Sequence, residues 1–213
     1  MTRELVYGRR PVREVIRAGR RQILELSATE RSLASEPWLR DETGLRVHVE
    51  REGKLNELAV GERPLIACLD QVTDPHNLGA VCRSADGAGA TGVVVTEHKA
   101  ARVTPAVCRA SAGAVEHVRI GVVVNLARYL TDVKRGDLWV WAASGDAGTP
   151  IWSADFTTGA ALVFGAEGRG LRPLVRKTCD DAFAIPLAGA VESLNVSVAA
   201  GVALFEAARQ RRS

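Results

Sequence analysis

The start of an apolar segment near the C-terminus carries two side chains that could do chemistry. Ser193 and Asn195 flank Leu194 at the point where a helix over 195–211 is expected. Ser and Asn side chains satisfy the unpaired N–H groups of a helix start. The same exposed amides favour a polar ligand or a developing negative charge. Two interpretations fit: a well-capped buried helix, or one wall of a ligand site.

A second candidate loop runs from Asp70 to Arg83. Asn77 opens an apolar-striped segment, and Arg83 follows almost two turns later among small and apolar residues. One interpretation is a structural arginine that is ion-paired with Asp86. The other is a bidentate clamp on a phosphate or carboxylate, which guanidinium geometry suits well.

A third candidate loop, over 164–171, places three glycines around Glu167. Glycine allows positive φ and a close approach of the backbone to a ligand. The loop matches neither G-x-x-x-x-G-K-[ST] nor G-x-G-x-x-G, so a phosphate-cradling site is poorly supported. A neutral or cationic ligand fits better, and a glycine-rich turn with a solvated glutamate is the alternative.

The elements that must position these loops alternate between short apolar runs and helical segments. This alternation predicts an α/β fold with a mostly parallel sheet and helices on both faces. Ligands of such sheets bind beyond the carboxyl ends of the strands, so the three loops should gather at one rim. Strands are expected over 65–69, 92–95, 138–143, 160–164 and 182–185, and helices over 77–89, 125–133, 171–178 and 195–211.

The first 56 residues predict a small α/β domain that precedes the sheet. Pro11 and Gly19 suit the two ends of a helix, and alternating segments at 22–26 and 46–50 resemble half-buried strands. A helical segment over 32–42 is interrupted by Pro37. Residues 57–64 are expected to form a short linker, and residues 65–213 the larger domain.

Composition narrows the function classes. The chain has 46% hydrophobic residues, no apolar run long enough to cross a bilayer and no signal-peptide core at its N-terminus. Its four cysteines are scattered, and its four histidines show no metal spacing. We therefore expect a cytoplasmic protein with reduced thiols, no bound metal and no membrane contact.

Positive charge is concentrated at the N-terminus. Residues 1–21 carry seven arginines and two glutamates, whereas the whole chain has a net charge of only +3. Such a segment favours contact with a phosphate backbone, and the low aromatic content of 5% favours recognition by phosphate and shape. Alternatively, arginine is simply the preferred surface cation, since only four of the 28 basic residues are lysine. The candidate RNA-binding residues are Arg9, Arg10, Arg13 and Arg17.

Taken together and in this order, the three loops resemble the SpoU family of RNA ribose 2′-O-methyltransferases, also called the TrmH family. The similar stretches are 74–83, 162–171 and 185–199, and the resemblance covers about residues 65–211. Residues 6–15 are similar to the substrate-recognition domain of the RlmB branch, which methylates a guanosine ribose of large-subunit (23S) rRNA. The linker over 57–64 is shorter than is usual in that branch.

The resemblance implies a C-terminal trefoil knot, S-adenosylmethionine as the methyl donor, and a homodimer with the site near the subunit interface. It also implies residue roles. Backbone groups of Gly165, Ile185 and Leu194 would hold the cofactor, and the reaction site would be lined by Asn77, Arg83, Glu167, Ser193 and Asn195.

The implied reaction is an in-line attack of a ribose 2′-hydroxyl on the sulfonium methyl. The family proposal makes Arg83 the base, but a guanidinium carries only donors and is a poor proton acceptor. We prefer a role in holding the adjacent phosphate and stabilising alkoxide character. Alternatives are a tRNA or antibiotic-resistance rRNA target, and a non-catalytic RNA-binding or ribosome-assembly module. An NTP-binding enzyme is weakened by the missing phosphate loop.

Overall fold

The computed structural model describes residues 6–20, 23, 26, 62–134 and 138–212. The expected strand over 46–50 and the expected helix over 32–42 lie outside these residues. Of the expected strand over 22–26 only two residues are described, and of the expected linker over 57–64 only the last three. The proposed boundary between the two domains therefore stays a prediction.

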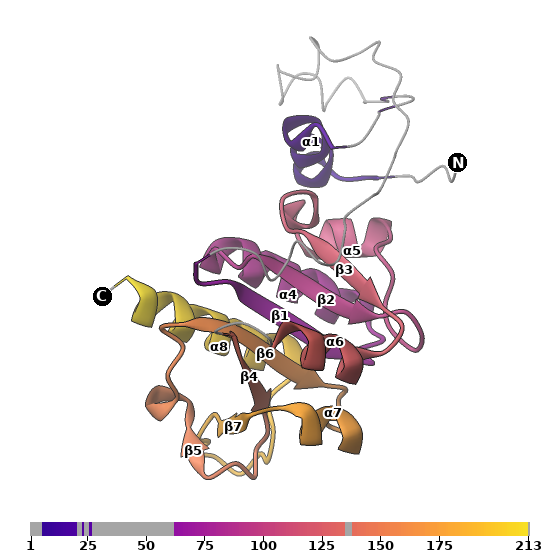
Figure 1. Cartoon of the computed structure of the whole chain (residues 1–213). Helices are drawn as coiled ribbons and strands as arrows, with labels where there is room; N and C mark the ends of the chain where they lie inside the picture. The colour runs from indigo at the N-terminus through magenta and orange to yellow at the C-terminus, as the bar shows by residue number, and fades with distance from the viewer. Residues whose placement is uncertain (1–5, 21–22, 24–25, 27–61, 135–137, 213) are drawn as a thin grey trace.

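A seven-stranded sheet forms the centre of the molecule, in the order β3-β2-β1-β6-β4-β7-β5 (Figure 1). Neighbouring strands are parallel in every pair, which confirms the predicted parallel α/β fold. The strands are β1 (Leu65–Asp70), β2 (Gly92–Thr96), β3 (Ile120–Val123), β4 (Leu138–Ala143), β5 (Thr149–Pro150), β6 (Gly159–Gly165) and β7 (Asp181–Ala184).

The sheet is covered on both faces, which is why its central strands read as unbroken apolar runs. All six residues of β1 are buried. Successive side chains point to opposite faces of a strand, so Leu65 and Leu69 join one core and Ile66 and Cys68 join the other.

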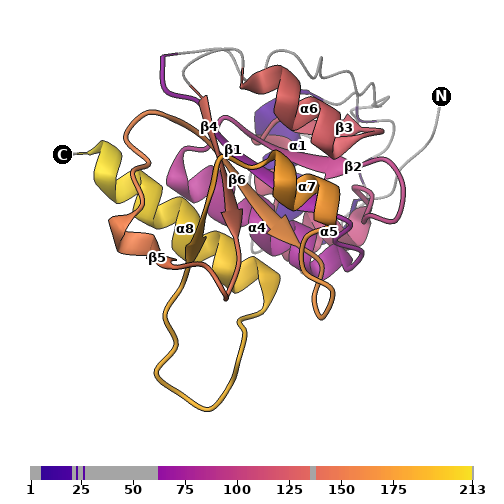
Figure 2. The same cartoon turned by 60° about the horizontal axis from the view of Figure 1, so that its bottom comes forward.

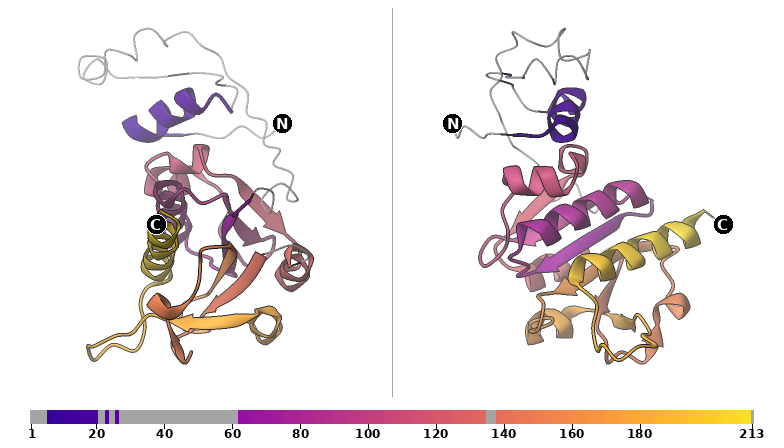
Figure 3. Two further views of the ribbon diagram at one scale, coloured as in Figure 1. Left: turned by 60° about the vertical axis from the view of Figure 1, so that its left-hand side comes forward. Right: turned by 180° about the vertical axis from the view of Figure 1, so that it is seen from behind.

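Helices pack on these two cores from opposite sides (Figure 3). One face carries α4 (Pro75–Ala88), α5 (Pro105–Ala110) and α8 (Val196–Arg211), and the other carries α6 (Leu126–Val133) and α7 (Pro173–Thr178). The contact of α4 with α5 requires glycine at position 79. A Cβ there would lie 2.5 Å from the Cβ of Ala110.

Three differences from the sequence-based expectations have local causes. The helix α5 and the strand β3 were not predicted, because six residues and four residues are too few to establish a periodicity. The helix α4 begins at Pro75, two residues earlier than expected. Asp74 caps it by accepting a hydrogen bond from the His76 amide at 2.8 Å, and Pro75 suits the first helical position.

The helix α1 (Arg9–Ala18) packs on the core beside α5 and the 3-10 turn Ala114–Glu116. Pro11 and Val15 are buried on its inner side. The Oε2 atom of Glu14 lies 2.7 Å from Nε2 of His117, which ties α1 to the residue after that turn. Three of the candidate RNA-binding side chains remain exposed on α1, namely Arg10, Arg13 and Arg17.

Within the described parts of the chain, no helix combines the length and apolarity needed to span a bilayer.

The last turn of α8 lies at the end of the sheet where β1 and β6 begin, and it binds the segments that lead into these two strands. The guanidinium of Arg211 donates hydrogen bonds to the carbonyl oxygens of Arg63 at 2.9 Å, Phe156 at 2.8 Å and Thr158 at 2.5 Å. Burial lowers the pKa of Arg211. This one side chain therefore joins the start of β1, the start of β6 and the C-terminal helix.

We expect Arg211→Leu to lower the free energy of unfolding by about 2–4 kcal/mol, because several carbonyls lose a charged donor. The control is Arg209→Gln on the same helix, since Arg209 forms an exposed pair with Glu206. Urea denaturation should show a clearly smaller change for the control. Equal midpoints for the two variants would contradict this role of Arg211.

Candidate functional site

The three candidate loops meet where β1 and β6 lie side by side. The chain leaves β1 toward α4 on one face of the sheet and leaves β6 toward α7 on the other. Adjacent strands whose connections diverge in this way leave a crevice at their carboxyl ends, which is where parallel α/β sheets bind ligands. The third loop, over 185–195, extends beyond this edge before it enters α8 (Figure 2).

Three polar side chains, one from each loop, form a closed hydrogen-bonded cluster. The Nδ2 atom of Asn77 donates to Oε1 of Glu167 at 3.0 Å. The Nδ2 atom of Asn195 donates to the same Oε1 at 2.6 Å and to Oδ1 of Asn77 at 2.9 Å. Asn77 is only 8% exposed, whereas Glu167 and Asn195 face the solvent. We call this group the Asn–Glu–Asn cluster.

The side chain of Asn195 also caps α8. Its Oδ1 accepts hydrogen bonds from the Ser197 amide at 2.9 Å, the Ser197 hydroxyl at 2.6 Å and the Val198 amide at 3.4 Å. The helix cap and the wall of a polar site are thus the same residue. Of the two interpretations that the sequence left open, the capped helix is confirmed by these bonds, and the ligand site stays a prediction.

The glycine-rich loop folds back on itself and displays Glu167. The Gly170 amide donates to the Ala166 carbonyl at 2.8 Å, and Gly168 and Gly170 both have positive φ. A Cβ at Gly165 would lie 2.1 Å from the carbonyl carbon of Gly170, so only glycine fits there. The tightness of this turn holds Glu167 against the other two loops.

A cavity of about 730 Å³ opens beside the cluster, within the range typical of small-molecule sites. Its walls come from the carboxyl ends of β4, β6 and β7 and from the start of α8. The lining includes every residue expected to hold a cofactor and three of those expected at the reaction site: Gly165, Ile185, Leu194, Glu167, Ser193 and Asn195.

The charge of this cavity is negative. Glu167 and Glu192 line it, and the lining contains no lysine, arginine or histidine. Nucleotide phosphates need positive side chains or a cradle of amides, so this cavity is poorly suited to them. A ligand that carries a positive charge would be stabilised by the two carboxylates.

Two expected reaction-site residues stand apart from the cluster. Arg83 is exposed on α4, six residues beyond Asn77 and so about 9 Å along the helix axis. It does not line the cavity, and no hydrogen bond or ion pair joins it to another described residue. Ser193 lines the cavity, and its hydroxyl makes no hydrogen bond within the described chain.

The sequence patterns did not identify two other residues at this edge. Ser144 and Gly145 line the cavity directly after β4. The Ser144 hydroxyl donates to Oδ1 of Asp146 at 2.5 Å and holds the pKa of Asp146 below its usual value. The position of Ser144 at the carboxyl end of an apolar run was the available signal.

The pair of Asp70 and Arg172 was also missed. It joins residues 102 positions apart, at the end of β1 and the start of α7. No pattern in the sequence connects the two positions.

Comparisons with known proteins agree with this geometry. The model of the SpoU rRNA methylase family matches residues 64–205. The 23S rRNA (guanosine-2′-O-)-methyltransferase RlmB of Vibrio vulnificus is 47% identical over 174 residues, covering 79% of this chain and 70% of the relative. RlmB of Pseudomonas putida is 50% identical over 149 residues, covering 70% of this chain and 60% of the relative.

A solved structure is similar over nearly the whole chain. It is the SpoU methyltransferase AviRb from Streptomyces viridochromogenes in complex with the cofactor AdoMet, with a TM-score of 0.78 at 27% identity. The match covers 96% of this chain and 88% of AviRb. The chain therefore belongs to the SpoU rRNA methylase family.

The described residues contain no cluster of three or more His, Cys, Asp or Glu that could hold a metal ion.

The cluster predicts energetic coupling between Asn195 and Glu167. In Asn195→Asp the helix cap is retained, but a carboxylate oxygen replaces the donor that lies 2.6 Å from Oε1 of Glu167. We expect a loss of about 1–2 kcal/mol in the free energy of unfolding, most of which Glu167→Gln should restore in the double variant.

Chemical denaturation of both single variants and the double variant measures this coupling. Asn195→Ser is the matched control, because serine caps the helix without adding a second carboxylate. Strictly additive effects, within about 0.3–0.5 kcal/mol, would show that the two side chains do not interact.

Proposed function

We propose that this chain transfers a methyl group from S-adenosylmethionine to the ribose 2′-hydroxyl of a guanosine in 23S rRNA, in the cytoplasm. The observation that carries the proposal is the Asn–Glu–Asn cluster at the mouth of a negatively charged cavity. Relatives at 47% and 50% identity are named as enzymes of this specificity.

The residues of the cavity fit S-adenosylmethionine. The cavity volume of about 730 Å³ accommodates S-adenosylmethionine, which is a nucleoside joined to an amino acid. The backbone at Gly165, Ile185 and Leu194 can bind the polar edges of such a ligand, because these residues line the cavity from the end of β6, the segment after β7 and the segment before α8. The carboxylates of Glu167 and Glu192 favour its cationic part. AviRb, which is 27% identical, was crystallised with this cofactor.

When bound, S-adenosylmethionine would supply an electrophilic methyl group to the ribose 2′-oxygen, its sulfonium would leave as a neutral thioether, and the hydroxyl proton would pass to solvent. The cluster would orient the ribose for this attack. One oxygen of Glu167 is occupied by Asn77 and Asn195, and Oε2 accepts no hydrogen bond within the described chain. The Ser193 hydroxyl is a further polar group at the same wall.

Arg83 is suited to bind the RNA backbone beside the reacting nucleotide. It is exposed and lies outside the cavity, so an incoming phosphate can reach its guanidinium. Bound there, the cation stabilises the negative charge that develops on the 2′-oxygen. A guanidinium, which has five N–H donors and no acceptor atom, suits this role better than that of a base.

We expect Arg83→Lys to lower the turnover number by about 100-fold, as expected for a transition-state contact, with unchanged affinity for S-adenosylmethionine. Incorporation of labelled methyl into 23S rRNA measures turnover, and calorimetry measures cofactor affinity. Unchanged turnover with normal RNA binding would exclude both roles of Arg83. Absence of cofactor binding by the wild-type protein would instead favour a non-catalytic RNA-binding module.

The proposal includes the trefoil knot. β7 lies on the far side of β4 from β6, yet α8 packs on α4 and contacts β1 and β6. The connection over 185–195 must therefore return across the edge where the glycine-rich loop lies. This path is consistent with a chain that threads itself around the cofactor cavity.

The proposal also includes a homodimer that pairs through α8. Val198, Val202 and Phe205 are exposed at a helical spacing that puts them on one face of α8. This apolar face continues from the cluster at Asn195, so a second copy packed on it would lie beside the proposed reaction site.

We also assign RNA contact to the arginines of α1.

We expect Phe205→Glu to convert the dimer to a monomer, because a charge would be buried in the apolar contact. Light scattering after size exclusion measures the mass. The control is Leu174→Glu, which changes an exposed leucine on the opposite face of the sheet. A variant at Phe205 that stays dimeric would exclude this face as the interface.

A further inference from the structure

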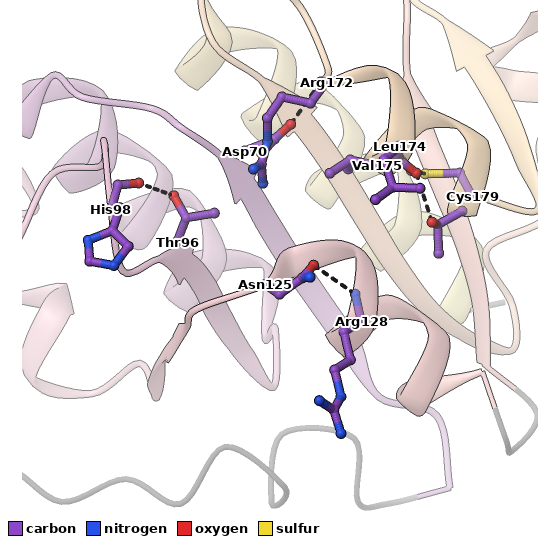
Figure 4. A network of polar contacts seen from close by, with 10 residues as sticks. Asp70, Thr96, His98, Asn125, Arg128, Arg172, Leu174, Val175 and Cys179 are labelled. Atoms are coloured by element: carbon purple, nitrogen blue, oxygen red, sulfur yellow. Dashed lines mark hydrogen bonds and ion pairs between the residues drawn. The ribbon is translucent and has the colours of Figure 1, made fainter.

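The carboxylate of Asp70 is buried at the carboxyl end of β1, where it is bound entirely by one residue from a distant loop. Its side chain is 0% exposed. The Oδ1 atom accepts from Nε and Nη2 of Arg172, both at 2.8 Å, and Oδ2 accepts from the Arg172 backbone amide at 2.9 Å. Figure 4 shows the two side chains between β1 and the start of α7.

The backbone of Asp70 contacts the other end of the same loop. In the parallel pairing of β1 with β6, Asp70 lies opposite Gly165. The glycine-rich loop therefore begins beside the main chain of Asp70 and ends, at Arg172, on its side chain. Glu167 lies between these two anchored ends.

The position of Asp70 along the chain also links the glycine-rich loop to the segment that leads into α4. The residues that follow Asp70 lead directly into α4, which carries Asn77. Asn77 donates to Glu167, so the donor and the acceptor belong to loops that Asp70 joins. A shift of Arg172 relative to β1 would move Glu167 away from Asn77 and from the cavity wall.

We propose that Asp70 and Arg172 are positioning residues for methyl transfer: their buried pair holds the loop over 165–171 so that Glu167 meets the two asparagines. This inference rests on the proposed function for its kinetic consequences. Its structural part, the restraint of the loop, is independent of any activity.

An ion pair near the other end of α7 provides a control. Nζ of Lys134 lies 2.7 Å from Oδ1 of Asp180, just beyond the C-terminal end of α7, and both side chains are partly buried. Oδ2 of Asp180 also accepts from the Val140 amide at 2.9 Å, so Asp180→Asn disturbs an ion pair and a backbone contact without touching the loop over 165–171. General loss of stability should therefore be shared by Asp70→Asn and Asp180→Asn, and loss of positioning should not.

The first test measures the loop directly. Arg169 is exposed within it, so limited trypsin digestion followed by mass spectrometry gives the cleavage rate after Arg169. We expect Asp70→Asn to raise this rate at least tenfold and Asp180→Asn to leave it within twofold of wild type. Equal rates in all three proteins would overturn the proposal, whether or not the protein methylates RNA.

The second test separates positioning from folding in the whole 213-residue chain. We expect Asp70→Asn to lower kcat at least tenfold and to weaken S-adenosylmethionine binding several-fold, with the KM for 23S rRNA within threefold. Arg172→Lys keeps the charge and the backbone hydrogen bond, so we expect smaller losses of kcat and of cofactor affinity than in Asp70→Asn. If Asp70→Asn fails to fold, Arg172→Lys alone tests the proposal. A folded Arg172→Lys and Asp70→Asn that both match wild type in kcat and cofactor affinity would overturn the proposal.

Discussion

The parallel pairing of β1 with β6 is the constraint on which the rest of the site depends. It runs from Leu65 opposite Ala160 to Asp70 opposite Gly165, so the two strands end together. Their connections diverge to opposite faces of the sheet, and both loops present side chains at the crevice between them. The buried carboxylate of Asp70 reinforces this arrangement, because an unpaired charge there would be costly.

The third loop reaches this crevice through Asn195, whose side chain has two structural roles. Asn195 satisfies the first amides of α8 with its oxygen and uses its nitrogen to bind Asn77 and Glu167. Any displacement of the helix start therefore disturbs the polar cluster, and the reverse also holds. The cavity beside the cluster takes its negative charge from Glu167 and Glu192, and Arg169 of the glycine-rich loop does not line it.

The sequence predicted the central strands well, because burial on both faces leaves continuous apolar runs such as those of β1 and β6. It also predicted that three loops converge, since that follows from parallel topology alone. It could not predict which side chains touch. The partners of Glu167 lie 90 and 28 positions away, and Arg172 lies 102 positions from Asp70. Such contacts depend on strand order, which no local pattern encodes.

We propose that the three converging loops form a site for ribose methylation of 23S rRNA. A nucleotide-resolution map of 2′-O-methylation in total RNA tests it most directly, in cells with the gene, without it, and complemented with either the wild-type chain or Glu167→Ala. We expect one guanosine of 23S rRNA to lose its methyl group on deletion and to regain it only with the wild-type chain. An unchanged map, or full restoration by Glu167→Ala, would contradict it.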